Sequence, residues 1–426
     1  MIQIFNYGQV PNEAIFAREN IAANVADVVR DIIADVRKNG DDALYAYAAR
    51  FDKARLTALE VTQAEMDEAM AQVEPEFLDI LREAAANIRA FHEKQVRTGF
   101  IMDRAGVIMG QKLTPIEKVG LYVPGGTAAY PSTVLMDSIP AKIAGCREIV
   151  MVTPPRADGT VNPVILAAAG IAGVTRVFKM GGARAVAALA YGTRSVPRVD
   201  KIVGPGNAYV AEAKKQVFGQ VAIDMIAGPS EILVVADASA QPRFVAADLL
   251  SQAEHDRMAS AVLVTDSRDF AEAVSRELEL QIPLLPRAEI ARESIDRNGK
   301  IIVAQDLKLA IDIANEIAPE HLELCVEDPF RYLDQIRHAG SIFLGKYCPE
   351  ALGDYFAGPN HTLPTSGTAR FSSPLSVDDF VKKSQFTYFT SDALKAVADK
   401  VAYFAQKEGL QAHAKSATIR FEEDKS

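Results

Sequence analysis

The pentapeptide Ser251-Gln252-Ala253-Glu254-His255 places an amide and an imidazole side chain three residues apart. Residues 244–250 before it are apolar at helical spacing, so Gln252 and His255 are expected on one face at the end of a buried helix. An amide and an imidazole that converge on one point could bind a metal ion. The alternative is a surface or helix-capping pair, and the spacing alone leaves it open.

A carboxylate and an imidazole are adjacent at Glu320 and His321, directly after Pro319. Because proline restricts the backbone, the two side chains are expected to leave a fixed turn in different directions. Histidine titrates near neutral pH and suits removal of a proton from an alcohol, whereas glutamate can activate water. A helix N-terminus that favours acidic residues is the alternative interpretation.

Two further carboxylate and imidazole pairs occur later in the chain. Asp354 and His361 lie in a Gly/Pro-rich loop after an expected strand, where α/β proteins place ligands, and this pair suits zinc. A turn with a partly exposed histidine would give the same pattern. Glu408 and His413 flank Gly409 at an expected helix end, and by themselves they indicate no site.

Three glycine-rich turns lie before segments that are expected to be helical. A turn of this kind lets the backbone approach a phosphate, and the helix N-terminus favours negative charge. None matches G-x-G-x-x-G, so a standard Rossmann site is not indicated, and single turns are often structural. Three in one segment favour a nucleotide bound in a non-standard way. The turns are Pro124-Gly125-Gly126, Gly181-Gly182 and Gly204-Pro205-Gly206-Asn207.

The elements that would position these residues alternate in type. From about Lys118, β-rich runs, glycine turns and Ala-rich helices follow one another, which predicts parallel βαβ units in a doubly wound sheet. After Ser230 the alternation continues with longer helices and predicts a second α/β sheet. Residues 25–96 and the segment after Asp378 are predicted to be helical. Strands are expected at 119–123, 149–152, 177–178, 201–203, 232–235, 261–264, 301–303 and 341–344.

This pattern predicts four parts. Residues 1–16 form an N-terminal arm, and residues 17–121 with 230–377 form a main α/β domain that includes the N-terminal helices. Residues 122–229 form an inserted α/β domain. The last part, 378–426, is predicted to be a helical tail. Because so short a segment rarely holds a core unaided, it lies on its own sheet domain or crosses to a second subunit.

The composition excludes several classes of protein. A chain of 426 residues with 49% hydrophobic content can bury two or three cores. A net charge of −10 argues against nucleic acid or an anionic membrane as a partner. The N-terminus does not resemble a signal peptide and no apolar run could span a bilayer, so a cytoplasmic protein is expected. Three cysteines predict buried thiols and no disulfide framework.

Together these motifs resemble the histidinol dehydrogenase family over almost the whole chain. The resemblance implies two doubly wound, incomplete Rossmann-like sheet domains of the aldehyde-dehydrogenase type, with small N- and C-terminal helical segments, in a domain-swapped homodimer. It also implies NAD-dependent, four-electron oxidation of L-histidinol to L-histidine through bound L-histidinaldehyde, the last two steps of histidine biosynthesis. The segments that carry it are 119–126, 203–208, 227–231, 248–255, 319–322 and 353–361.

The resemblance implies a role for each candidate residue. His321 would take the alcohol proton, and Glu320 would activate the water that adds to the aldehyde. The implied zinc ligands are Gln252, His255, Asp354 and His413, the last from the partner subunit. The implied substrate contacts are these four, His321, Ser230, His361 and Glu408. The implied dinucleotide contacts are Tyr122, Arg184 and Asn207.

Arg184 departs from the family pattern, which commonly has glutamine at this position. Arginine cannot accept a hydrogen bond but can pair with a pyrophosphate, so the contact is expected to persist in altered form or NAD affinity to differ. An exposed arginine in the first turn of a helix is the alternative.

Three other functions would use some of the same residues. A related enzyme could act on another small polar alcohol, but Glu408 and His413 match contacts to an amino-imidazole substrate. A zinc hydrolase with Glu320 as base would leave the glycine-turn segment without a purpose. A catalytically silent metal-binding protein would need neither Glu320 nor His321.

Overall fold

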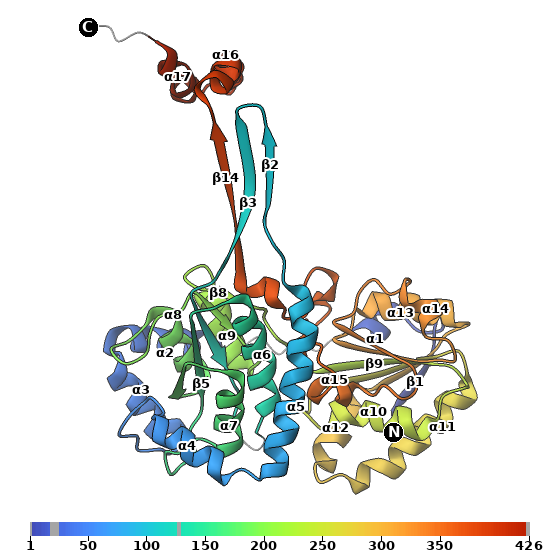
Figure 1. Ribbon diagram of the computed structural model, residues 1–426. Helices are drawn as coiled ribbons and strands as arrows, with labels where there is room; N and C mark the ends of the chain where they lie inside the picture. Colours follow the sequence, from blue (N-terminus) through green and yellow to red (C-terminus); the bar gives the residue numbers. More distant parts are fainter. Residues whose placement is uncertain (1, 18–24, 126–128, 423–426) are drawn as a thin grey trace. The chain divides into compact units, whose positions relative to one another are not determined.

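The structure is a computed structural model that describes residues 2–17, 25–125 and 129–422. Gly126 and Thr127 of the first glycine turn lie outside the described residues, as do positions 18–24 of the predicted main domain. The chain forms two compact units (Figure 1). The first unit contains the segments up to Gln95 and from Ile116 to Phe380, and the second contains Val96–Pro115 and the segment from Val381 onward.

A five-stranded parallel sheet is the first of two sheets in the first unit. Its strand order is β6-β5-β4-β7-β8, so the chain winds outward in both directions from β4. This confirms the predicted doubly wound arrangement. The strands are β4 (Lys118–Tyr122), β5 (Glu148–Thr153), β6 (Arg176–Lys179), β7 (Lys201–Val203) and β8 (Ala222–Ile223). The helices between them are α6 (Pro131–Ala144), α7 (Pro163–Ala172), α8 (Gly182–Tyr191) and α9 (Ala208–Val217).

The N-terminal helices pack on this five-stranded sheet. Val119 and Leu121 of β4 face one layer, formed by α4 to α7, and Val150 and Val152 of β5 face the other, which includes α2, α3, α8 and α9. The expectation that these helices share the core of the second sheet is therefore not met, because their apolar faces are buried here. The elements are α2 (Ala26–Asn39), α3 (Asp41–Tyr47), the π-helical turn η1 (Ala48–Asp52), α4 (Gln63–Gln72), α5 (Pro75–His92) and η2 (Glu93–Gln95).

The second sheet has six parallel strands in the order β1-β11-β10-β9-β12-β13. From β9 outward the winding repeats that of the first sheet, and the predicted N-terminal arm adds β1 beside β11. The strands are β1 (Gln3–Asn6), β9 (Glu231–Ala236), β10 (Ser260–Thr265), β11 (Lys300–Val303), β12 (His321–Cys325) and β13 (Ser341–Leu344).

Helices cover both faces of the six-stranded sheet. Ile232 and Val234 of β9 face α10 to α12, whereas Leu233 and Val235 face α13 and the start of the chain. This alternation of buried apolar side chains is that of a parallel sheet enclosed on both sides. The elements are α1 (Asn12–Phe16), α10 (Pro242–Ala253), α11 (Arg268–Gln281), η3 (Ile282–Leu284), α12 (Ala288–Asn298), α13 (Leu307–Ile317), α14 (Phe330–Leu333), α15 (Glu350–Tyr355), η4 (Thr368–Arg370) and η5 (Val377–Phe380).

The second unit contains a three-stranded antiparallel sheet in the order β14-β3-β2, followed by a helical hairpin. The prediction that the whole of 378–426 is helical is wrong for its first part, since β14 pairs with β3 over nine residues. Aromatic and β-branched residues such as Phe386 and Thr387 favour this strand. The elements are β2 (Phe100–Arg104), β3 (Val107–Pro115), β14 (Val381–Phe389), α16 (Ser391–Lys407), α17 (Gln411–Thr418) and η6 (Ile419–Phe421).

No helix in the described ranges combines the length and apolar character needed to cross a bilayer.

Candidate functional site

A cluster of titratable side chains lies at the amino ends of β9 and β12, which are neighbours in the six-stranded sheet. His321 is the first residue of β12, and its Nδ1 lies 2.9 Å from the backbone oxygen of Glu231. A carbonyl oxygen only accepts hydrogen bonds, so Nδ1 carries the proton. The Glu231 backbone N–H donates to Oε2 of Glu320 at 2.8 Å. The alternative of a helix N-terminus at Glu320 is therefore wrong.

The free nitrogen of His321, Nε2, faces Asp354. It lies 3.7 Å from Oδ1 of Asp354 and is buried without a hydrogen-bond partner among the described residues. Burial lowers the pKa of His321, but the carboxylates of Glu320 and Asp354 outweigh that effect and raise it to about 10. Burial also raises the pKa of Glu320 to about 8. The cluster thus holds two groups that can exchange protons side by side.

Gln252 and His255 stand at the end of α10, as the sequence predicts. Gln252 is only 1% exposed, and its Oε1 has no hydrogen-bond partner among the described residues. The backbone N–H of His255 donates to the Gln252 backbone oxygen at 3.0 Å. Burial lowers the pKa of His255, while Asp354 acts in the opposite direction. A neutral imidazole and a free amide oxygen are both suited to bind a cation.

Asp354 belongs to the short helix α15, not to the predicted loop. The Nδ1–H of His361 donates to the Asp354 backbone oxygen at 3.1 Å, and Nε2 of His361 lies 3.2 Å from the Thr133 hydroxyl. Burial raises the pKa of Asp354, but His321 and His361 outweigh it and hold that pKa below its usual range. The charge of Asp354 also opposes the lowering of the pKa of His255 by burial. The Asp354 carboxylate therefore interacts with three imidazoles, those of His321, His361 and His255.

The first unit brings together most of the predicted site residues. Ser230 directly precedes β9, and its backbone oxygen accepts from the Ser260 N–H at 3.0 Å. Glu408 and His413 belong to the second unit, where Gly409 with φ of 78° separates α16 from α17 as predicted. Both side chains are exposed in the described chain. The residues gathered in the first unit are Gln252, His255, Glu320, His321, Asp354 and His361.

Glu350 adjoins this cluster and was missed by the sequence analysis. Its Oε2 accepts from the Ser251 hydroxyl at 2.6 Å, which ties the end of α10 to α15. Atoms of Glu350, His321 and Asp354 lie within 4.8 Å of one another, close enough to share a metal ion. Burial raises the pKa of Glu350 to about 7.

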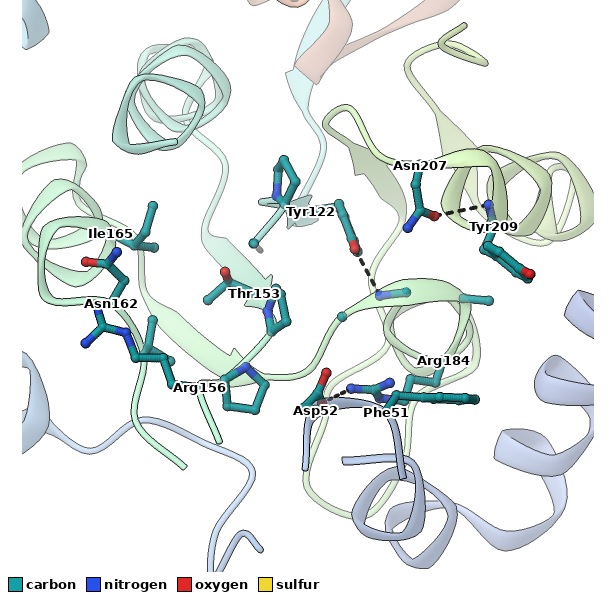
Figure 2. A pocket seen from close by; sticks show the side chains of 18 of the residues that line it. Phe51, Asp52, Tyr122, Thr153, Arg156, Asn162, Ile165, Arg184, Asn207 and Tyr209 are labelled. Carbon is teal, nitrogen blue, oxygen red and sulfur yellow. Dashed lines mark hydrogen bonds and ion pairs between the residues drawn. The ribbon is translucent and has the colours of Figure 1, made fainter. Parts of the chain in front are cut away.

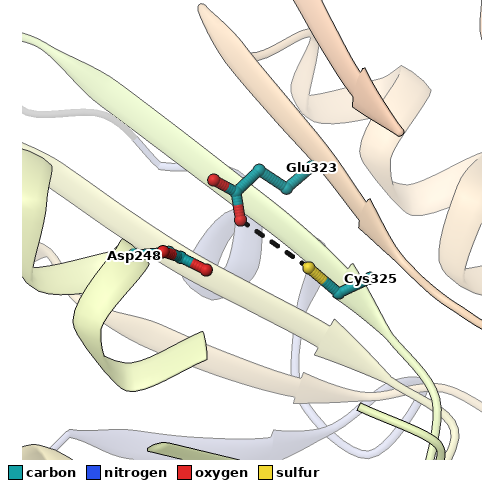
Figure 3. A group of neighbouring side chains, drawn as sticks. All are labelled: Asp248, Glu323 and Cys325. Atoms are coloured by element: carbon teal, nitrogen blue, oxygen red, sulfur yellow. Dashed lines mark hydrogen bonds between the residues drawn. The ribbon is translucent and has the colours of Figure 1, made fainter. Parts of the chain in front are cut away.

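A second buried group lies behind Glu350. Glu323 accepts from the Glu350 backbone N–H at 2.7 Å and from the Cys325 thiol at 3.7 Å (Figure 3). Burial raises the pKa of Glu323 and raises that of neighbouring Asp248 to about 6. Two carboxyl groups in contact in such a place share a proton. The one signal in the sequence was Glu323 itself, a charged residue between Leu322 and Leu324 in an apolar strand.

A cavity of about 680 Å³ opens at the carboxyl ends of β4 to β7 (Figure 2). All three residues predicted to contact the dinucleotide line it. The Tyr122 hydroxyl accepts from the Gly182 backbone N–H at 2.9 Å, and Asn207 caps α9 by accepting from the Tyr209 N–H at 3.1 Å. The second and third glycine turns therefore meet at one pocket.

Arg184 forms part of one wall of this pocket. It is 4% exposed and ion-paired with Asp52 of η1, which rules out the alternative of an exposed arginine. The guanidinium also lies 5.8 Å from the ring centroid of Phe51. Burial raises the pKa of Asp52 and lowers that of Arg184, so burial outweighs the stabilisation that each charge gives the other. Neither Phe51 nor Asp52 was predicted as a pocket residue.

Comparison with known proteins gives one consistent family. The family model described as histidinol dehydrogenase matches residues 17–421. The histidinol dehydrogenase of Listeria monocytogenes is 56% identical over 406 residues, covering 95% of each chain, and that of Clostridium acetobutylicum is 52% identical with 99% of each chain covered. A crystal structure of histidinol dehydrogenase from Elizabethkingia anophelis is similar with a TM-score of 0.93 and 39% identity, covering 98% of each chain.

Proposed function

Because the chain belongs to the histidinol dehydrogenase family and is therefore an oxidoreductase, we propose that it oxidises L-histidinol to L-histidine with NAD. The reaction removes four electrons in two steps through bound L-histidinaldehyde, and it completes histidine biosynthesis. The observation that carries this proposal is the pairing of two sites in the first unit. One is a pocket at glycine turns, and the other is a cluster with a proton-accepting imidazole.

The pocket at the five-stranded sheet supports dinucleotide binding. Its lining includes the first residues of α8 and the start of α9, and a helix N-terminus suits an anionic pyrophosphate. Tyr122, Arg184 and Asn207 would hold the dinucleotide, and NAD would supply the hydride acceptor, one molecule for each of the two oxidations. Asp52 would keep the Arg184 side chain in place and partly neutralise it. NAD binding is therefore proposed for the segment 122–229 together with the helices packed on it.

The donor set at the six-stranded sheet fits zinc. Gln252 offers an amide oxygen that has no hydrogen-bond partner in the described part of the chain, His255 a neutral imidazole, and Asp354 a carboxylate. Oxygen and imidazole nitrogen are ligands that zinc accepts. These three residues and His413 would hold the ion, which supplies a fixed positive charge that orients the imidazole and amine of the substrate.

Glu320 and His321 perform the proton chemistry in this proposal. Because Nδ1 of His321 is committed to the Glu231 carbonyl, Nε2 is the atom that takes the proton from the substrate hydroxyl. The raised pKa of this imidazole means that Nε2 must first release its own proton. Glu320 then takes a proton from the water that adds to the aldehyde carbon. The Glu231 N–H fixes one oxygen of Glu320, which leaves the other oxygen to meet that water.

Ser230, His361 and Glu408 are proposed to bind the substrate, together with His321 and the zinc ligands. His361 is fixed at both ring nitrogens, so it would present its ring to the substrate at a constant position.

We propose a cytoplasmic homodimer in which the second unit supplies Glu408 and His413 to the partner subunit. The second unit exposes many apolar side chains that a small antiparallel sheet and a helical hairpin leave uncovered. Exposed apolar side chains in such number are typical of an interface. The exposed side chains are Phe100, Ile101, Met102, Tyr388, Tyr403 and Phe404.

The reaction stoichiometry tests the function. Purified protein is supplied with L-histidinol, NAD and zinc, and NADH and L-histidine are both quantified. Two NADH per L-histidine are expected, because each oxidation reduces one NAD. Absence of NADH, or one NADH with free aldehyde accumulating, would contradict the proposal.

Subunit complementation tests the shared site. His413→Ala and Glu320→Gln subunits are each expected to be inactive, and mixing them should restore part of the activity. Each mixed dimer has one site with both residues intact. Mixed dimers verified by differential tagging that remain inactive would place His413 in the site of its own subunit.

A further inference from the structure

Helix α6 holds the loop that carries His361 by three consecutive contacts on one face. The Thr133 hydroxyl lies 3.2 Å from Nε2 of His361, and the Met136 backbone oxygen accepts from the Asn360 side chain at 2.7 Å. Asp137 Oδ1 accepts from the Thr362 hydroxyl at 2.8 Å. Positions 133, 136 and 137 share a helix face, so each residue of the loop 360–362 meets its own partner on α6.

The Thr133 contact fixes the orientation of the His361 ring. Since Nδ1–H is donated to the Asp354 backbone oxygen, Nε2 bears the lone pair that accepts from the Thr133 hydroxyl. Thr133 and Asp354 therefore hold the imidazole from opposite sides. A shift of α6 would move the ring relative to Asp354.

Asp137 also lies against the third glycine turn. Its side chain is fully buried, and Oδ2 has no hydrogen-bond partner among the described residues. A Cβ placed on Gly204 would come within 3.0 Å of that Oδ2. Gly204 is itself held by the buried Lys214–Asp224 pair, since Asp224 accepts from its N–H at 2.8 Å and Lys214 donates to its oxygen at 2.9 Å.

A buried carboxyl with one oxygen unpaired is costly, and a purely structural position would be served as well by an amide or an apolar side chain. Asp137 incurs this cost between two functional segments. On one side is the Gly204 turn that leads to Asn207 in the pocket, and on the other is the His361 loop. The start of α6 also follows residues that line the pocket, namely Pro124, Gly125 and Ala129.

We propose that Thr133, Asp137 and Thr362 are positioning residues through which α6 couples dinucleotide binding in the pocket to substrate binding at His361. The inference rests on the proposed function, because it takes NAD and an amino-imidazole as the two ligands. A ligand that fixes the position of the Gly204 turn and of the start of α6 therefore also fixes the position of the loop 360–362. Close-packed elements move as units, so a small displacement at one site is transmitted to the other.

Ligand linkage tests the coupling without catalysis. The affinity of the zinc-loaded enzyme for L-histidine, the product, is measured by calorimetry with and without saturating NAD, a pair that cannot react further. In the unmodified protein NAD should tighten L-histidine binding about fivefold or more. In Thr362→Val, which loses the hydroxyl but keeps the shape, the ratio should fall to within about twofold of unity. Thr362→Ser should restore it.

Two further variants keep the test decisive. Thr133→Val removes the α6 hydroxyl that bonds to His361 and should also reduce the ratio, whether or not Thr362→Val folds. Thr175→Val is the matched control, because it removes a threonine hydroxyl that bonds to the Ile149 backbone at the opposite ends of the strands. Its ratio should equal that of the unmodified protein.

The outcomes separate this inference from the proposed function. If neither ligand binds the unmodified protein, the proposed function fails. If both bind but NAD leaves the L-histidine affinity unchanged, or if folded Thr362→Val and Thr133→Val retain the full ratio, the coupling through α6 is wrong.

Discussion

The two sheets of the first unit share a winding order but differ in which end holds functional residues. In the five-stranded sheet β4 and β7 meet at the centre, and the pocket lies beyond their carboxyl ends. In the six-stranded sheet β9 and β12 occupy the equivalent places, yet Glu231 and His321 stand at their amino ends. In the proposed function, the usual rule for open α/β sheets, that ligands meet the carboxyl ends, therefore holds for the first sheet only.

The local chemistry of the carboxyl ends explains the difference. In the first sheet Gly181 and Gly204 follow β6 and β7, and glycine backbone is open to a ligand. In the second sheet Asp237 follows β9 and accepts hydrogen bonds from the backbone N–H groups of Ser239 and, beyond β12, Glu327. That end is closed by its own side chain. A sheet can therefore offer backbone groups to a ligand at the carboxyl ends of its strands, or side chains at the amino ends.

Substitution of His321 should have the largest effect and tests the amino end. In His321→Asn the amide matches the Nδ1 donor to Glu231 but lacks the proton acceptor, so kcat should fall about 10²–10⁴-fold. Stopped-flow measurement of NADH formation gives the rate. Zinc content and NAD affinity should stay unchanged, as should kcat in the control His338→Asn. Loss of zinc would instead make His321 a ligand.

Breaking the Arg184–Asp52 pair tests the wall of the pocket. Arg184→Gln leaves a mostly buried carboxylate without its charged partner, which should cost about 3–5 kcal/mol of folding free energy. The double variant with Asp52→Asn should recover part of this loss, and urea unfolding of the four proteins measures the coupling. Additive effects in that cycle would show that the pair does not hold the wall together.

A methyl group at Gly204 tests the carboxyl end of the first sheet. Gly204 has φ of 112°, and an added Cβ would collide with the Tyr122 backbone oxygen, so Gly204→Ala should lose about 1–3 kcal/mol of stability and bind NAD more weakly. Gly219→Ala is the control, because φ is 95° but no atom lies within 4 Å of the added Cβ. Equal NAD affinity in both variants would show that the Gly204 turn does not contribute to NAD binding.

Substitution of Asp237 should have the smallest effect, and it tests whether the carboxyl end of β9 in the second sheet takes part in the reaction. Asp237→Ala removes acceptors at the carboxyl end of β9, which should cost about 1–3 kcal/mol of stability because backbone N–H groups lose partners. The ratio kcat/KM for L-histidinol should remain within about twofold. A tenfold loss in a stable variant would show that this end also serves the reaction.

Most strands of the two parallel sheets were readable from local sequence, but β1, β8 and β12, the strand that begins with His321, were not predicted. Short apolar runs before glycine turns indicated the first sheet, apolar runs alternating with longer helices indicated the second, and helical spacing before Gln252 placed the end of α10. Apolar runs and helical spacing are set by residues that are close in sequence, so they can be read without knowledge of the fold. Strands β2, β3 and β14 were missed because their pairing joins Val107–Pro115 to Val381–Phe389, and one strand alone carries only a weak propensity.

The site was predicted less completely than the fold. His321, Asp354 and Gln252 could be found as residue types that suit a reaction. Their supporting residues could not, because Glu350 and Asp137 act through contacts made only in the folded chain. Asp137 did leave a trace in the sequence, as a charged residue within the apolar stretch 134–139. The choice of the amino ends of β9 and β12 had no local signal, since it follows from which strands become neighbours.

The pairing of β3 with β14 sets an order of events during translation. The hairpin of β2 and β3 leaves the ribosome well before Val381–Phe389 is synthesised, so one edge of β3 stays unpaired meanwhile. Open strand edges of this kind attract other chains. We therefore expect the nascent polypeptide to be prone to aggregation until Val381–Phe389 emerges, and slowing elongation late in the message should increase aggregation.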